Sequence, residues 1–271
     1  MTLSRCLGCR RASKDHRAGR RYTIGRRNLL IAAGSAGVLA GLTACSPLAA
    51  NPDTRPVALI YRGPASCAGC SEAVATLLRN NPTPFRTVFC GPSEPVQLSP
   101  DSLATATVYA QPGGGNVDSA WRKLSQHADD IKTYVRGGGH YLGFCLGGYL
   151  AGTSPGFALL RGDANRYITS PQATVDNTND TVVPIRWRGQ LRHMFFQDAP
   201  LFRLDSGTAA TVLATYDTGA VAAMVTSYGA GRVGVVGPHP EADRSWYPSG
   251  LTNPDGIRPD LGYDLIQTTI T

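Results

Sequence analysis

Residues 140–152 read HYLGFCLGGYLAG, and this stretch decides the fold that we expect. A short apolar run leads into one cysteine, Cys145, with glycine at Gly143 and Gly147 on either side. A sharp turn from a strand into a helix needs small neighbours, which glycine supplies. The turn would lift the sulfur to the carboxyl edge of a sheet, at a helix N-terminus that favours a thiolate. We therefore predict a reactive thiol at Cys145, with a packed structural cysteine as the alternative.

Upstream of this turn, short apolar runs alternate with helical patterns. Strands are expected at 57–61, 85–90, 105–110 and 141–145, and helical patterns at 73–78 and 117–138. Each run is apolar throughout and ends at Gly or Pro, which is typical of parallel strands covered by helices on both faces. The sequence predicts an α/β fold, a three-layer, flavodoxin-like and mostly parallel sheet.

The chain changes character after Thr153. Residues 170–200 are polar and turn-rich, and we expect them to add antiparallel strands or a loop excursion to the same domain. Two further strand regions, 211–216 and 220–237, follow, the second with a turn at Gly229–Gly231. The turn-rich C-terminus either caps a pocket through Trp246 and Tyr247 or packs on the sheet edge. One domain over 57–271 is expected.

The formal net charge of +7 comes from the N-terminal segment. Residues 1–44 hold nine Lys or Arg and one acid, which leaves 17 basic and 18 acidic residues in the rest. The remainder is close to neutral, so the sequence gives no reason to expect a nucleic-acid partner.

This N-terminal segment is expected to be an export signal, with 45–56 as a tether. A 14-residue apolar stretch, 29–42, follows Arg26-Arg27 and suits the core of a signal peptide better than a membrane span. The arginine pair resembles a twin-arginine signal without its usual lysine. Leu42-Thr43-Ala44-Cys45 resembles a lipobox, so we expect lipid on Cys45 to anchor the protein at the outer side of a bacterial membrane. An anchor that is never cleaved is the alternative.

A thiol nucleophile needs a base, and the base needs an orienting partner. His127 lies among charges and His140 lies at the wrong end of its strand, while His193 lies within the polar excursion, as a pocket wall or as simple packing. His239 follows an apolar strand in GPHPEAD, with Glu241 two residues on, where a carboxylate can take the imidazole N–H. We therefore expect His239 as base and Glu241 as its partner.

A glycine-rich loop, QPGGGN at 111–116, follows the strand TVYA. Backbone N–H groups of Gly113, Gly114 and Gly115 could hold an oxyanion, with the Leu146 N–H as a further donor. A flexible turn between strand and helix is the alternative.

Together these segments resemble the class I glutamine amidotransferase-like fold, and more closely the N-terminal domain of biotin–protein ligases, here as a stand-alone bacterial lipoprotein. The resemblance covers about residues 57–247, through VALIYRGPASC, VYAQPGGGN, GFCLGGYLAG and GAGRVGVVGPHPEAD. It implies a triad of Cys145, His239 and Glu241. Tyr149 stands where glutamine-hydrolysing members carry a substrate-binding glutamine, which implies a different substrate.

Four cysteines remain in the domain, in a compartment where disulfides persist. A disulfide between Cys90 and either Cys67 or Cys70 is the leading expectation, and a Cys67–Cys70 pair is the alternative. Three thiols without a nearby histidine make a poor zinc site, so neither a metal nor a cofactor is expected.

Three functions remain open from sequence. The first is thiol-dependent hydrolysis or acyl transfer on an amide-type bond of an unknown small molecule or peptide. The second is a non-catalytic small-molecule-binding module on the same fold. The third is a thiol–disulfide protein built on Cys67 and Cys70, which is weakened because no aromatic residue precedes the pair as in thioredoxin-like motifs.

Overall fold

The computed structural model describes residues 53–271, of which 54–271 form one compact unit. The expected export segment 1–44, the lipidation site Cys45 and the tether up to residue 52 lie outside the described residues. In the part of the chain that the structure describes, no helix is long and apolar enough to cross a membrane.

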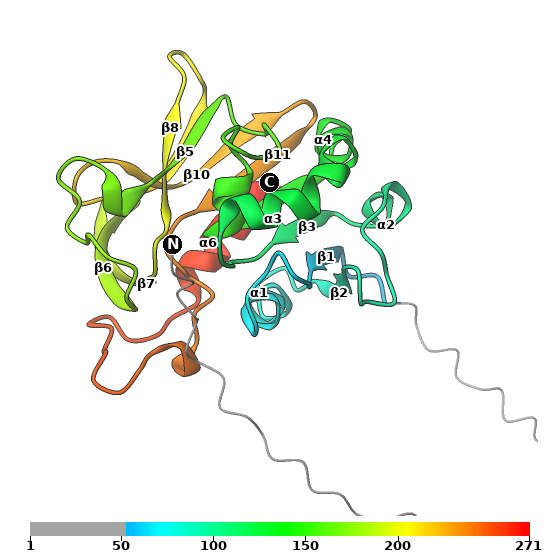
Figure 1. Ribbon diagram of the computed structural model, residues 1–271. Coiled ribbons are helices and arrows are strands. Elements are labelled where there is room, and N and C mark those ends of the chain that lie inside the picture. The colour runs from blue at the N-terminus through cyan, green and yellow to red at the C-terminus, as the bar shows by residue number, and fades with distance from the viewer. Residues whose placement is uncertain (1–52) are drawn as a thin grey trace, which may run out of the picture. The chain divides into compact units, whose positions relative to one another are not determined.

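A single sheet runs through the described unit in the order β2-β1-β3-β4-β11-β10-β9-β6-β7 (Figure 1). Its first five strands are parallel: β2 (Arg86–Cys90), β1 (Val57–Tyr61), β3 (Val108–Gln111), β4 (His140–Phe144) and β11 (Gly231–Val236). These strands are short and apolar because helices cover both faces. The predicted parallel strands and their order along the chain are confirmed within a few residues.

From β11 onward every pairing is antiparallel, so the antiparallel half is larger than the sequence suggested. It consists of β10 (Val221–Tyr228), β9 (Ala210–Tyr216), β6 (Thr181–Trp187) and β7 (Gln190–Phe196), with β8 (Pro200–Leu204) pairing both β10 and β5 (Gly162–Arg166). The stretch 170–200 therefore adds strands to the domain.

Helices pack on the two faces of the parallel half (Figure 1). Apolar side chains of α1 (Cys70–Arg79) and α6 (Asp260–Ile270) cover one face. The other face is covered by α2 (Pro100–Ala104), α3 (Val117–Leu124), α4 (Ala128–Arg136) and α5 (Leu146–Leu150). A 3₁₀ turn at Ser125–His127 divides the helix predicted at 117–138, and two more lie at Tyr167–Thr169 and Arg244–Trp246.

Helix α6 is not predicted by the sequence analysis, which describes the C-terminal segment only as turn-rich. Its buried side chains Leu261, Leu265 and Ile266 form one apolar stripe against the sheet. A Cβ on Gly262 would lie 2.7 Å from the Leu77 side chain, so glycine lets α6 approach α1 closely.

Candidate active site

The thiol of Cys145 lies at the sharp turn between β4 and α5. Its backbone has φ 47° and ψ −99°, a conformation that costs a non-glycine residue on the order of 1–3 kcal/mol. The Cys145 N–H donates to the Val236 carbonyl at 2.9 Å, which fixes the turn to the end of β11. A Cβ on Gly147 would lie 2.0 Å from the Gln111 carbonyl oxygen, so the glycine allows α5 to pack directly on β3. The Cys145 side chain is almost fully buried, at 5% exposure.

His239 and Glu241 follow β11, the parallel neighbour of β4, and so lie beside the thiol. His239 Nδ1 is 2.9 Å from Glu241 Oε1, and both side chains are buried, at 4% and 0% exposure. The His239 N–H donates to the Phe195 carbonyl at 2.9 Å, and the Trp246 ring lies 5.0 Å from the imidazole. The Glu241 carboxylate is therefore within hydrogen-bond distance of the His239 imidazole, as the two-residue spacing predicts.

The electrostatics of His239 depend on two partners. Burial by itself lowers the pKa of the imidazole, but the negative charges of Glu241 and Cys145, with hydrogen bonds to both, raise this pKa to about 10. The structure thus brings Cys145, His239 and Glu241 together as one interacting group.

The raised pKa of His239 predicts a pH-dependent stability. A folded-state pKa above the unfolded value stabilises the fold fully below about pH 6.5, and that contribution is lost as the pH rises toward about 10. We expect the difference in unfolding free energy between wild type and His239→Gln to shrink across this range. Urea unfolding of both proteins measures it. A difference that grows with pH would contradict the assigned partners.

The glycine loop after β3 reaches the same site. A methyl group placed on Gly113 would lie 3.1 Å from His239 Cε1, and one on Gly114 would lie 2.4 Å from the Leu146 side chain. Gly115 has open space around its Cα. Within residues 53–271, the N–H groups of Gly113–Gly115 have no backbone acceptor. The loop thus offers free donors beside the imidazole and next to the residue that follows Cys145.

The structure corrects the leading disulfide expectation. Cys67 is bonded to Cys70, and Cys90 is a free thiol. Cys90 is fully buried at the end of β2, in the core cluster under α2 and α4, where burial raises its pKa to about 12. The pair instead lies in the β1–α1 loop, where the Cys67 N–H donates to the Gly113 carbonyl at 3.0 Å.

Residues between β5 and β8 form one wall of the site, and this wall was not predicted from the sequence. Cys145 Sγ lies 3.8 Å from the Gln197 carbonyl oxygen, and Gln197 Nε2 donates to Asp180 Oδ1 at 2.8 Å. Burial raises the pKa of Asp180, which the nearby His239 charge partly offsets. The sequence does contain a signal for this wall: Gln197 and Asp198 are polar residues that directly follow the apolar end of β7, much as His239 follows β11.

Tyr149 of α5 contacts this wall at Asp198. Its hydroxyl donates to the Asp198 carbonyl at 3.3 Å, and the Asp198 carboxylate takes a two-pronged ion pair from Arg166 at 2.5–2.6 Å. Burial first, and then the charges of Cys145 and Asp198, raises the pKa of Tyr149. The Tyr149 phenol is therefore near the Cys145 thiol, and a backbone carbonyl holds its hydroxyl.

The remaining histidines take no part in this group. His140 begins β4, at the opposite end of the strand from Cys145. His127 lies in the 3₁₀ turn after α3. His193 on β7 pairs with Asp255, with Nδ1 and Oδ1 3.2 Å apart, and lines a hollow together with His239, Arg192 and Asn253. Within the described residues, no three His, Cys, Asp or Glu side chains are grouped to hold a metal ion.

Comparison with known proteins bears on the fold. Residues 57–169 match the family described as "Biotin-protein ligase, N terminal", which supports that domain in this part of the chain. No match is found among curated proteins. A chain in the "Structure of PurLQS from Thermotoga maritima" is similar at a TM-score of 0.55 and 15% identity, over 80% of this chain and 98% of that one. "Cytoplasmic Protein STM3548 from Salmonella typhimurium" is similar at 0.47 and 13%, over 79% and 98%. The fold is class I glutamine amidotransferase-like, as predicted.

Proposed function

We propose that residues 57–271 form a thiol-dependent hydrolase or acyl-transfer enzyme that acts on an amide-type bond of a small molecule or peptide. The observation that carries this proposal is the buried, interacting group of Cys145, His239 and Glu241 beside a loop of free N–H donors. Each part of that group has a role in acyl transfer.

The reaction proceeds in two steps. Cys145 Sγ attacks the carbonyl carbon with its proton already held by His239, whose raised pKa keeps that proton on the imidazole, and N–H groups of Gly113–Gly115 and Leu146 hold the oxyanion. The C–N bond then breaks, the leaving amine takes the proton from His239, and a thioester remains on Cys145. Water, or another acceptor, attacks the thioester with His239 as base and frees the thiol. Glu241 holds Nδ1–H, so that the other ring nitrogen faces the sulfur.

Turnover of an activated ester tests this proposal without knowledge of the natural substrate. Wild type should hydrolyse p-nitrophenyl acetate with an initial burst of p-nitrophenol, and Cys145→Ala should lose the burst and the turnover. Cys90→Ala is the matched control, because Cys90 is the other free thiol of the described residues and lies buried in the core, where it is not among the groups that act on His239. Equal rates for wild type and Cys145→Ala would reject the enzyme.

A binding module is the second candidate, and the position of Tyr149 favours it. Its hydroxyl donates to the Asp198 carbonyl, and it stands where glutamine-hydrolysing members carry a substrate-binding glutamine. Thermal stabilisation by a small molecule that survives Cys145→Ser, together with no ester turnover, would support binding over catalysis.

We also propose that the protein is exported and anchored to the outer side of a bacterial membrane by lipid on Cys45. Support comes from the apolar stretch 29–42 and the lipobox-like end at Cys45. Wild type expressed in a bacterium should partition into detergent and Cys45→Ala should not. Mass spectrometry of the mature N-terminus decides between cleavage before Cys45 and an uncleaved anchor.

A further inference from the structure

The Cys67–Cys70 disulfide lies directly against the loop that the proposed mechanism uses. Cys70 Sγ would be 3.6 Å, and His239 Cε1 3.1 Å, from a methyl group placed on Gly113. One glycine therefore separates the disulfide from the catalytic imidazole. Cys70 is buried, at 1% exposure, whereas Cys67 is partly open to solvent.

Two hydrogen bonds join the disulfide segment to the glycine loop. The Cys67 N–H donates to the Gly113 carbonyl at 3.0 Å, and Gln111 Nε2 donates to the Ala65 carbonyl at 3.0 Å. Gln111 is itself held by the Tyr109 hydroxyl at 2.8 Å. A movement of residues 65–70 is therefore transmitted to residues 111–115.

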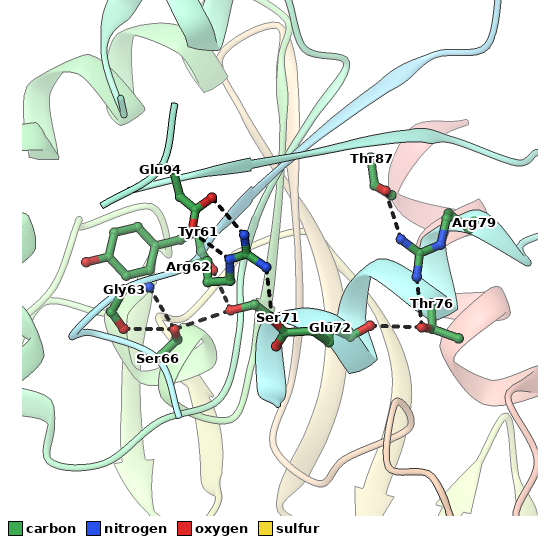
Figure 2. A network of polar contacts seen from close by, with 10 residues as sticks. All are labelled: Tyr61, Arg62, Gly63, Ser66, Ser71, Glu72, Thr76, Arg79, Thr87 and Glu94. Carbon is green, nitrogen blue, oxygen red and sulfur yellow. Dashed lines mark hydrogen bonds and ion pairs between the residues drawn. The ribbon is translucent and has the colours of Figure 1, made fainter. Parts of the chain in front are cut away.

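The two ends of this segment are fixed by other contacts, as Figure 2 shows. The Arg62 guanidinium binds both oxygens of Glu94 at 2.6 and 2.8 Å and reaches Glu72 of α1 at 3.0 Å. The Ser71 hydroxyl donates to the Tyr61 carbonyl at 2.8 Å. These contacts hold β1 and α1 together whether or not the disulfide is present. The Cys67–Cys70 disulfide is thus the one restraint on this segment that reduction can remove while the contacts at both ends remain.

We propose that Cys67–Cys70 is a thiol-exchange site for a dithiol reductant, and that its reduction releases the Gly113 loop from its catalytic position. This inference rests on the proposed function for its catalytic consequence. A reductant thiolate attacks Cys67 Sγ, the more accessible sulfur, and the S–S bond breaks with Cys70 leaving as thiolate. The second reductant thiol attacks the mixed disulfide and frees Cys67. Two electrons and two protons pass to the protein, and the reductant becomes a disulfide.

The opened form keeps the anchored ends but loses the covalent restraint between them. Gly69, which lies between the cysteines, has φ +83° and gives the freed segment conformational range. The Cys70 side chain can then move away from Gly113. The Cys67 N–H, no longer held in place by the disulfide, can break its hydrogen bond to the Gly113 carbonyl. Displacement of an oxyanion loop by about 1 Å can cost about 10²-fold in rate.

Dithiothreitol under native conditions tests the inference on the whole protein. Trapping with N-ethylmaleimide and peptide mapping should show Cys67 and Cys70 freed, with buried Cys90 unlabelled. After removal of the reductant without air, deuterium uptake of residues 111–116 should rise, and p-nitrophenyl acetate turnover should fall by about tenfold to a hundredfold. Cys67→Ser/Cys70→Ser should show both changes without reductant and should not respond to it.

The two readouts separate the inference from the proposed function. Absence of turnover in both redox states would reject the enzyme, while deuterium uptake of 111–116 would still decide whether the disulfide restrains the loop. A disulfide that resists dithiothreitol in the native protein, or reduction that leaves that uptake unchanged, would overturn the inference.

Discussion

Replacing His239 with alanine should slow p-nitrophenyl acetate turnover by about 10²- to 10⁴-fold, the range that a positioned general base supplies. The variant removes the group that holds the thiol proton and leaves both carboxyl oxygens of the buried Glu241 side chain without a partner among the described residues. Glu241 Oε2 already lacks a partner among the described residues, so Nδ1 of His239 is the contact that the carboxylate has. Steady-state rates across pH measure the effect.

His193→Ala is the matched control for this change. His193, like His239, pairs with a carboxylate and lines the same hollow, but no hydrogen bond joins it to Cys145 in the part of the chain that the structure describes. We expect it to keep most of the wild-type turnover. Comparable losses in the two variants, or a His239→Ala rate within a fewfold of wild type, would show that His239 is not the base. Circular dichroism of each variant checks that it folds.

Replacing Gly147 with alanine should destabilise the protein by about 3 kcal/mol or more, at the upper end of the cost of overpacking. The added Cβ would lie 2.0 Å from the Gln111 carbonyl oxygen and 2.9 Å from its carbon, and both are backbone atoms of a buried strand. Alanine gains about 1 kcal/mol in helix propensity over glycine, which is too little to offset this contact. Urea unfolding measures the loss as a lower midpoint.

Gly115→Ala separates this steric effect from a general intolerance of the site to alanine. Nothing lies within 4 Å of a Cβ at Gly115, which belongs to the neighbouring glycine loop. Its unfolding midpoint should stay close to that of wild type. A Gly147→Ala midpoint that matches the Gly115→Ala midpoint would mean that α5 does not pack on β3 as described.

The parallel half of the fold could be predicted because its strands are short, apolar and ended by turn residues. The run VALIY was predicted at 57–61, and β1 spans Val57–Tyr61. The antiparallel half carries a weaker signal, because Pro184 interrupts β6 where a strand interior normally excludes proline. Helix α6 was missed because Gly262 and two threonines lower its helix propensity, and burial against the sheet decides its conformation.

The candidate triad could be predicted because its members stand just after strands that are neighbours in the sheet. Cys145 follows β4 and His239 follows β11, so the sheet order brings them together. The disulfide could not be chosen from sequence, because three cysteines all lie after strands at the same edge. Position in the fold decides it: Cys90 lies in the core cluster under α2 and α4, while Cys70 and Cys67 both contact Gly113 of the glycine loop.

The central claim is that Cys145 is the nucleophile, and the most direct measurement is the site of the acyl group after brief exposure to p-nitrophenyl acetate. Quenching in acid followed by peptide mapping should find acetyl on the peptide that contains Cys145, at close to one per molecule. Acetyl spread over Lys123, Lys132 and surface hydroxyls, with the Cys145 peptide unmodified, would contradict the account.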